Sequence, residues 1–246
     1  MTCGGVAAKD VVVVIPVYNH GATVATVVRK VLSLRLPVIV VDDGSTDDTF
    51  ENIRSIPEIR VLRHEVNRGK GAALVTGMKA AAEDCRWAVS IDADGQHDPA
   101  EIPRLLAAAT PETIVIGNRT GMAAAPWTSR FGRKFSNFWL RLSGAPPLAD
   151  TQSGFRVYPL PGVLHLGVKA RRYQYELEVL AKAAWRGIAI VEVPVSVSYL
   201  PPGRRISHFR PWRDFFRNAQ TFSRLITRRV FSPKLWRCGT SGSCKI

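Results

Sequence analysis

Short apolar runs rich in valine and isoleucine alternate with segments of helical periodicity along the first 120 residues. The runs predict five strands, at Val11–Ile15, Val38–Val41, Ile59–Leu62, Trp87–Ile91 and Thr113–Gly117. The segments between them predict helices near Ala22–Leu34, Thr46–Ser55, Gly71–Glu83 and Pro99–Ala108. Strands that are apolar throughout and alternate with helices are typical of a mostly parallel sheet with helices on both faces. The pattern therefore predicts an α/β fold.

Beyond residue 120 the pattern is less regular. Small residues at Gly121–Pro126 predict a linker. Further helices are predicted at Arg130–Leu142, 173–186 and Pro211–Val230, and two strands at Ile188–Val193 and Val195–Tyr199, on either side of Pro194. Helix 173–186 carries Glu176 and Glu178, which we expect to be solvated, with the alternative that one of them faces a site.

The chain has 246 residues and a formal net charge of +14, which is unevenly distributed. Residues 1–200 contribute +4 and residues 201–246 contribute +10. We therefore divide the chain into a folded domain, 1–200, and a basic C-terminal segment, 201–246. The charge of that segment favours an anionic partner, which can be a membrane surface, a nucleic acid or a phosphorylated substrate.

The predicted C-terminal helix is amphipathic. Apolar residues recur every three or four positions, at Phe209, Trp212, Phe215, Phe216, Ala219, Phe222, Leu225 and Ile226, and Arg210, Arg213, Arg217, Arg224 and Arg228 lie on the other faces. Such a helix suits an anionic bilayer surface; the alternative is that it packs its apolar face on the domain. No apolar run approaches the ~18 residues that cross a bilayer, so we expect peripheral attachment. Nucleic acid is disfavoured because no binding motif accompanies the charge.

Two aspartates, Asp92 and Asp94, follow the fourth predicted strand, and Gly95 then turns the chain. Carboxylates at the end of a buried strand are costly to desolvate unless a positive charge lies between them. Mg²⁺ is often bound by one or two carboxylates together with substrate phosphates. This stretch therefore indicates a metal-bridged diphosphate, with a solvated Asp-Gly turn as the alternative.

Other polar loops follow the remaining strands, at Pro16–His20, Asp42–Asp47, Asn67–Gly71 and Gly117–Arg119. Ligands of parallel sheets bind beyond the carboxyl ends of the strands, so these loops are expected to form one site. A carboxylate after the second strand can bind a nucleobase or ribose, whereas the residues after it can cap a helix. Neither a GxGxxG nor a GxxxxGK[ST] sequence is present, which argues against a dinucleotide-binding fold and a phosphate loop.

Taken together and in order, the segments PVYN, VDDGSTDDT, NRGKGAA, DADGQHDP, GNR and DTQSGFR resemble the family-2 glycosyltransferases of GT-A fold. The resemblance extends from Val11 to about Tyr199. It is strongest to the branch that makes dolichyl- and polyprenyl-phosphate sugars. The fold that it implies is Rossmann-like, a mostly parallel sheet flanked by helices, here with a basic amphipathic helix at the C-terminus.

The resemblance also implies roles for individual residues. The nucleotide-sugar would be bound by Pro16, Tyr18, Val41, Asp42, Asp43, Lys70, Ala93 and Arg119. Asp92, Asp94 and Gln96 would hold Mg²⁺ or Mn²⁺ and the donor diphosphate, and the catalytic set would be Asp92, Asp94 and Asp150. The acceptor phosphate would meet Arg133, Ser136, Arg204 and Arg205, although Arg133 and Ser136 fit an ordinary helix face nearly as well.

Asp150 distinguishes two possible acceptors. A phosphate oxygen is already ionised near neutral pH and needs no general base, whereas a sugar hydroxyl needs one. The function expected from the resemblance is inverting, metal-dependent transfer of a hexose from a nucleoside-diphosphate sugar to a polyprenyl phosphate, by a peripheral protein on the cytoplasmic face of the membrane. The alternatives are a glycan or lipid hydroxyl acceptor, a sugar-phosphate nucleotidylyltransferase, and a non-catalytic membrane-binding module.

Overall fold

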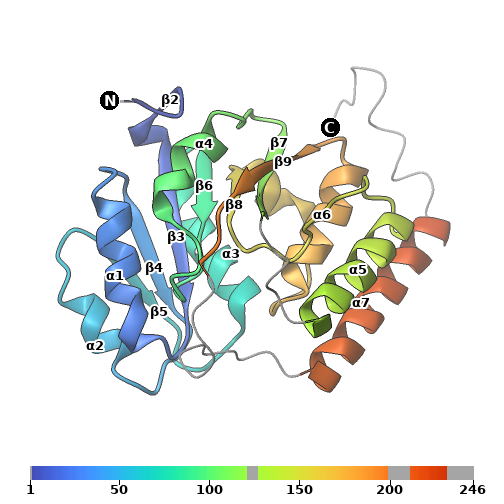
Figure 1. The fold of residues 1–246 in the computed structure, drawn as a ribbon, viewed down its shortest axis with the longest axis horizontal. Helices are drawn as coiled ribbons and strands as arrows, with labels where there is room; N and C mark the ends of the chain where they lie inside the picture. The colour runs from blue at the N-terminus through green and yellow to red at the C-terminus, as the bar shows by residue number, and fades with distance from the viewer. Residues whose placement is uncertain (1, 121–126, 199–210, 232–246) are drawn as a thin grey trace.

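A computed structural model describes residues 2–120, 127–198 and 211–231, without the side chains of 127–134 and 211–216. Its centre is a seven-stranded sheet in the order β5-β4-β3-β6-β8-β7-β9 (Figure 1). The strands are β3 (Val11–Val17), β4 (Val38–Asp42), β5 (Arg60–Arg63), β6 (Trp87–Ser90), β7 (Thr113–Arg119), β8 (Arg156–Pro159) and β9 (Ala189–Val195). A two-stranded hairpin, β1 (Thr2–Cys3) and β2 (Val6–Ala7), precedes the sheet.

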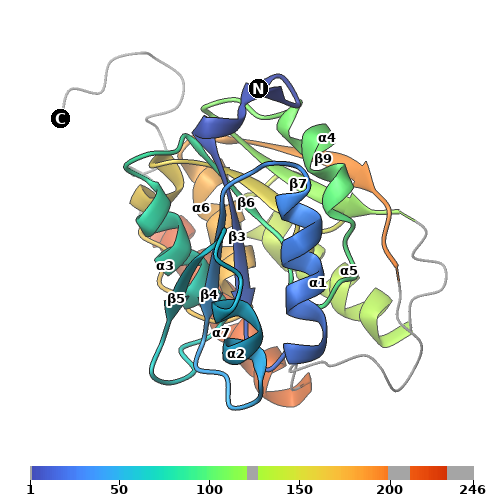
Figure 2. The same cartoon turned by 90° about the vertical axis from the view of Figure 1, so that its left-hand side faces the viewer.

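Helices cover both faces of the sheet, as Figure 2 shows with α1 and α4 on one side and α3 and α6 on the other. They are α1 (Gly21–Leu32), α2 (Thr49–Arg54), α3 (Lys70–Ala81), α4 (Ile102–Leu106), α5 (Trp127–Leu142), α6 (Tyr175–Trp185) and α7 (Pro211–Phe231). Short 3-10 helices lie at Ala8–Asp10, Pro99–Glu101 and Gly162–Leu166. The predicted α/β class, with a mostly parallel sheet, is confirmed.

Alternate residues of β3 divide between two cores. Val11, Val13 and Ile15 pack with α1, α2 and α4 on one face. Val12 and Val14 pack with α3 and α6 on the other. Because both faces of the strand are buried, it has no polar side and is apolar throughout.

The strand β8 was not predicted. It runs antiparallel to both neighbours, with Val157 opposite Val89 of β6 and Val115 of β7. It has four residues and starts at the fully buried Arg156, so its sequence lacks an apolar run of the length that predicts a strand. Of the two strands predicted around Pro194, the first is β9, which continues through Pro194, paired with Asn118, and ends at Val195. The second is wrong in its described residues, because 196–198 form no strand beyond an isolated bridge between Val197 and His97.

The apolar face of α7 is directed inward where its side chains are described. Phe222 and Leu225 are each 1% exposed and belong to the core formed with α3, α5 and α6. The ring of Trp139 on α5 stacks on Phe222 with centroids 6.4 Å apart. The expectation that this face as a whole meets a bilayer is therefore wrong for Phe222 and Leu225, which pack on the domain.

A buried carboxylate joins α7 to α6. Glu178 accepts hydrogen bonds from the backbone N–H groups of Lys169 and Ala170 at 3.1 and 3.0 Å and pairs with Lys182 at 2.8 Å and with Arg224 of α7 at 2.6 Å. It is 1% exposed. The expectation of a solvated Glu178 is wrong because its partners come from three separate segments.

Candidate active site

The polar loops lie together at the carboxyl ends of the parallel strands, at the lower edge of the sheet in Figure 1. Because β8 runs in the opposite direction, its amino end reaches the same edge and brings Ser153, Gly154 and Phe155 beside β6 and β7. The hydroxyl of Ser90, the last residue of β6, donates to the Gly154 carbonyl at 2.7 Å. The expected convergence of loops therefore exists, with an additional contribution from the β8 end.

Asp92 forms an ion pair that the sequence analysis did not anticipate. The Lys70 ammonium lies 2.7 Å from Asp92 Oδ1 and 2.6 Å from Glu176 Oε1. Lys70 is the first residue of α3 and Glu176 is in the first turn of α6, so three elements meet at this ammonium. Glu176, expected to be solvated, is 5% exposed and faces the site.

The charges of this cluster stabilise one another. Burial alone would lower the pKa of Lys70, but Asp92 and Glu176 outweigh it and the pKa is raised. Burial would raise the pKa of Asp92, and the nearby Lys70 ammonium instead holds it below the usual range. Burial lowers the pKa of His97 to about 4, against the attraction of Asp92, so this imidazole is neutral at pH 7.

Asp94 and Gln96 form one hydrogen-bonded unit. The Gln96 backbone N–H donates to Asp94 Oδ1 at 3.0 Å and its side-chain amide donates to Oδ2 at 2.8 Å. Among the described residues, no three of His, Cys, Asp and Glu are placed to hold a metal ion by themselves. Two half-buried carboxylates and an amide are nevertheless the hard oxygen donors that Mg²⁺ takes when substrate phosphates complete its coordination. The chemistry of the donor set therefore fits such an ion.

The two acids at the end of β4, Asp42 and Asp43, are both buried and both bind loop residues. Asp43 accepts hydrogen bonds from His64 Nδ1 at 2.7 Å and from the N–H groups of Arg68 and Gly69 at 2.9 and 2.7 Å. Asp42 accepts from the N–H of Ser45 at 2.9 Å and lies 3.1 Å from Arg63 Nε. These two side chains fix the loops that precede α2 and α3.

The other residues expected at the nucleotide line the same edge. Tyr18 is half-buried directly after β3, beside Asn19, whose N–H donates to Ser45 Oγ at 3.0 Å. The Ala93 carbonyl accepts a hydrogen bond from Thr23 at 2.6 Å. Pro16 and Val41 are neighbours on β3 and β4, and the side chain of Val41 belongs to the core on the α3 side.

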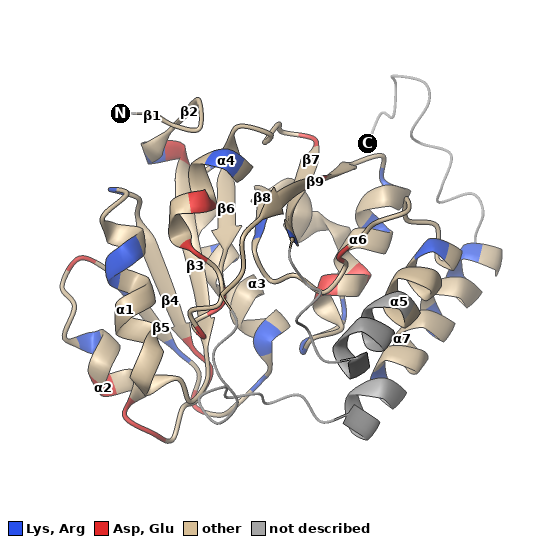
Figure 3. Cartoon of the chain, viewed as in Figure 1, with Lys and Arg blue, Asp and Glu red and all other residues tan. Residues whose placement is uncertain are grey.

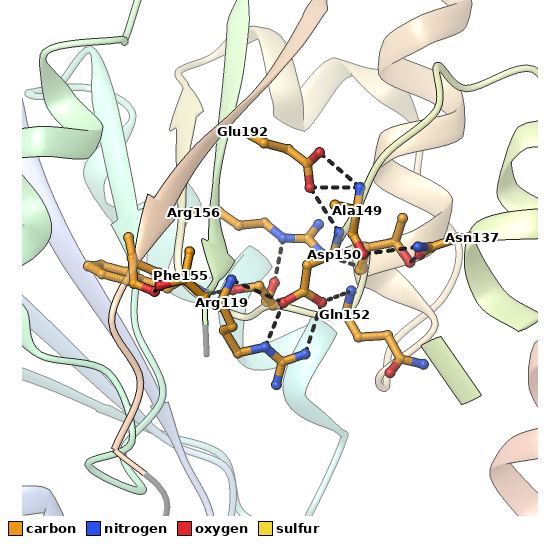
Figure 4. Close-up of polar contacts among 12 residues, drawn as sticks. Arg119, Asn137, Ala149, Asp150, Gln152, Phe155, Arg156 and Glu192 are labelled. Carbon is orange, nitrogen blue, oxygen red and sulfur yellow. Dashed lines mark hydrogen bonds and ion pairs between the residues drawn. The ribbon is translucent and has the colours of Figure 1, made fainter. Parts of the chain in front are cut away.

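Arg119, at the end of β7, is bound by Asp150 in two places. Its Nε donates to Oδ2 at 2.6 Å and its Nη2 to Oδ1 at 2.9 Å (Figure 4). Asp150 is fully buried, while the side chain of Arg119 is 17% exposed. Glu192 of β9 in turn accepts hydrogen bonds from the N–H groups of Ala149 and Asp150. The carboxylate of Asp150 is thus fixed on Arg119 by β7 and β9 together.

A buried arginine shapes the loop between Asp150 and β8. Arg156 is fully buried and donates to the carbonyls of Ser153, Thr151 and Glu176 at 2.7 to 2.8 Å. Because one guanidinium binds carbonyls of two segments, it holds this loop against the start of α6.

The residues expected at the acceptor are only partly described. Ser136, on α5, is 1% exposed and accepts a hydrogen bond from the Gln152 side chain at 3.0 Å, so the structure brings it to the Asp150 loop. The Arg133 side chain and the whole of Arg204 and Arg205 lie outside the described residues. Four further residues, Glu176, Glu192, His64 and Arg156, were not among the expected site residues. The first three pair with residues of other elements, which spacing along the chain does not indicate. Arg156 was missed because a charged residue at a strand end is usually solvated.

Comparison with known proteins identifies the family. Residues 12–158 match the model of glycosyl transferase family 2. The chain belongs to glycosyl transferase family 2. This confirms the expected glycosyltransferase class and sets aside the nucleotidylyltransferase and the non-catalytic module.

Relatives of this family-2 glycosyltransferase include a UDP-N-acetylglucosamine–dolichyl-phosphate N-acetylglucosaminyltransferase of Methanococcus voltae, 30% identical over 78% of this chain and 86% of the relative. An undecaprenyl-phosphate mannosyltransferase of Micrococcus luteus is 29% identical over 76% of this chain and 82% of its own. A solved structure, mannosyl-3-phosphoglycerate synthase from Rubrobacter xylanophilus, matches with a TM-score of 0.62 over 96% of this chain and 79% of its own, at 17% identity. The structural match confirms the GT-A type of fold.

Proposed function

We propose that this protein transfers a hexose from a nucleoside-diphosphate sugar to the phosphate of a polyprenyl phosphate, with inversion at the anomeric carbon and with Mg²⁺ or Mn²⁺. The observation that carries the choice of acceptor is the pairing of Asp150 with Arg119. Both oxygens of the buried carboxylate accept hydrogen bonds from one guanidinium. A base must reach the proton that it removes, and this carboxylate is directed at a cation instead.

An acceptor that is already ionised fits this arrangement. A phosphate oxygen attacks without losing a proton, so the enzyme has to position it and to stabilise the leaving diphosphate. The half-buried guanidinium of Arg119 is held by Asp150 at the site edge, which suits an anionic substrate group. The names of the relatives, which act on dolichyl and undecaprenyl phosphates, support the same acceptor class.

The metal would be held by Asp92, Asp94 and Gln96 together with oxygens of the donor. When bound, it would act as a Lewis acid and neutralise the charge that develops on the leaving diphosphate. The backbone N–H and the side-chain amide of Gln96 both donate to Asp94, so the two residues are held next to each other.

The test of the acceptor is the pH profile of Asp150→Asn. The donor is first selected by thermal shift with UDP, GDP and their sugars in the presence of Mn²⁺, because stabilisation follows ligand occupancy. Transfer to a short-chain polyprenyl phosphate is then measured from pH 6 to 9.

We expect Asp150→Asn to lose about tenfold or less in transfer rate, by the same factor at each pH, because a general base would contribute about 10²–10⁴-fold. Asp84→Asn, at an exposed position, is the control. A loss of a hundredfold or more that removes the acidic limb of the profile would establish Asp150 as a base and a hydroxyl acceptor.

We also propose that the protein binds the cytoplasmic face of an anionic membrane peripherally. None of the described helices is long and apolar enough to cross a bilayer. Four of the six large apolar side chains exposed in the described residues lie on two neighbouring helices, Phe138 and Leu142 on α5 and Val230 and Phe231 on α7. We call this the α5–α7 surface; Arg229 connects its two halves by donating to the Leu142 carbonyl at 2.8 Å.

The charge around the α5–α7 surface is of one sign. The sequence contains no Asp or Glu from 135 to 149 or from 217 to 231, and in Figure 3 the parts of α5 and α7 that are not grey have blue segments for Lys and Arg and no red ones. Each basic residue near an anionic bilayer contributes about 1 kcal/mol. We expect the double variant Phe138→Ser/Phe231→Ser to sediment less with phosphatidylglycerol vesicles than the wild type. Val66→Ser, also exposed but distant in the fold, is the control, and equal sedimentation of all three proteins would refute the surface.

A further inference from the structure

Lys70, which the resemblance assigns to the nucleotide-sugar, forms an ion pair with Glu176 in the structure. The Lys70 ammonium is shared between Asp92 and Glu176 at 2.7 and 2.6 Å, and its side chain is 16% exposed. Lys70 begins α3, where the positive end of the helix dipole disfavours a cation. An ammonium in that position is stable only because two carboxylates face it.

The backbone at Gly154 closes the space around this ammonium. A Cβ atom at Gly154 would lie 2.5 Å from the Lys70 ammonium and 2.5 and 2.8 Å from the two oxygens of Asp92. Residue 154 therefore has to be a glycine for Lys70 and Asp92 to pack against the segment before β8. Lys70 is thus confined beside Asp92 rather than extended into solvent.

Asp92 consequently has two cations that can bind its carboxylate. It already binds an ammonium, and in the proposed function it also binds a divalent ion. Two cations on one carboxylate repel each other, and the repulsion is little screened at a half-buried site. A stronger ion pair between Lys70 and Asp92 therefore weakens the binding of the divalent ion, and a weaker ion pair strengthens it.

We propose that Lys70 is a built-in competitor of the divalent ion for Asp92, and that Glu176 sets the strength of that competition by sharing the ammonium. The proposal rests on the proposed function in taking Asp92 as an ion ligand. The ion then binds the free protein weakly and binds well only when the donor diphosphate adds its own oxygens. Metal and donor are therefore coupled, each raising the affinity for the other.

The competition predicts effects of opposite sign for two residues in contact. Lys70→Met removes the competitor, and the free protein should bind Mn²⁺ about tenfold more tightly or better. Glu176→Gln leaves the ammonium to Asp92 alone, and Mn²⁺ should bind several-fold more weakly. In the double variant Lys70→Met/Glu176→Gln no ammonium is left for Glu176 to share, so its Mn²⁺ affinity should lie within about threefold of that of Lys70→Met. Independent effects of the two substitutions would instead add and bring the affinity back towards the wild type.

The experiment is titration of each protein with Mn²⁺ alone, followed by electron paramagnetic resonance of the free ion. Lys79→Met and Glu83→Gln, at exposed positions of the same region, are the controls. Circular dichroism verifies that each variant is folded. If Lys70→Met does not fold, Glu176→Gln still tests the competition, because glutamine has the same shape as glutamate. Shifts of Lys70→Met and Glu176→Gln in the same direction, or no shift in either, would overturn the competition while leaving the metal site in place. If none of the proteins bound Mn²⁺, the inference would fail together with the proposed metal; donor binding by thermal shift without metal would then show whether the rest of the proposed function stands.

Discussion

Gly154→Ala is expected to separate activity from stability. The added methyl carbon would lie 2.5 Å from Lys70 Nζ and 2.5 Å from Asp92 Oδ2, about 1 Å short of an ordinary contact of ~3.5 Å. Both atoms are ends of flexible side chains, so these side chains yield rather than the backbone. The expected outcome is a displacement of Asp92 and Lys70 by about 1 Å, and a misplacement of that size at a reacting centre can cost about 10²-fold in rate.

The predicted loss corresponds to about 2.7 kcal/mol of transition-state stabilisation at 1.36 kcal/mol per tenfold. The free energy of unfolding should change by less than about 1 kcal/mol, which moves Tm by about 2–4 °C in a chain of this size. Transfer to a short-chain polyprenyl phosphate and a thermal melt measure the two quantities. Gly162→Ala is the matched control, because a Cβ at Gly162 meets nothing within 4 Å. A Gly154→Ala protein with wild-type kcat/KM would refute the argument, and so would one whose activity falls only as far as its folded fraction.

Two further predictions concern stability. Glu178→Gln should make the free energy of unfolding less dependent on acid pH. Burial would raise the pKa of Glu178, but Lys182 and backbone N–H groups outweigh it and lower the pKa, so its stabilisation is present above the ordinary value of 4.5 and is lost as the pH falls through the lower folded value. Urea unfolding at pH 7 and pH 4 should show a smaller difference in the variant than in the wild type, and an equal difference would contradict this. Arg156→Met should lower the free energy of unfolding by at least about 3 kcal/mol, because three carbonyls lose their donor at about 1–3 kcal/mol each. Urea unfolding measures this, with Arg186→Met as the exposed control. A loss below about 1 kcal/mol would show that other groups replace the guanidinium.

The parallel part of the fold could be predicted because burial on both faces leaves a simple signal. Strands such as β3 and β4 are apolar at every position or nearly so, and the polar loops after them identify the edge where a ligand binds. The aspartates after β6 were located in the same way. What these predictions share is that each depends on residues close together in the sequence.

The parts that were missed depend on distant partners. The carboxylate of Glu176 is buried because it pairs with Lys70, 106 residues earlier, and that of Glu178 because Arg224 approaches from 46 residues later. The strand β8 begins with a buried arginine, Arg156, which donates to two carbonyls of the preceding loop and, 20 residues later, to the carbonyl of Glu176. Periodicity cannot indicate such pairings, since a charged residue on a helix or at a strand end is usually solvated.

The reversed direction of β8 has a consequence for how this enzyme can diversify. In the proposed function, the donor is bound by the loops that follow the parallel strands, whereas Asp150 and Gly154 both belong to the one segment that connects α5 to β8. Insertions or deletions in that segment would reshape the part that is proposed to face the acceptor and would leave β3, β4 and β6 intact. Related enzymes could in this way exchange one recipient molecule for another while retaining the same activated sugar.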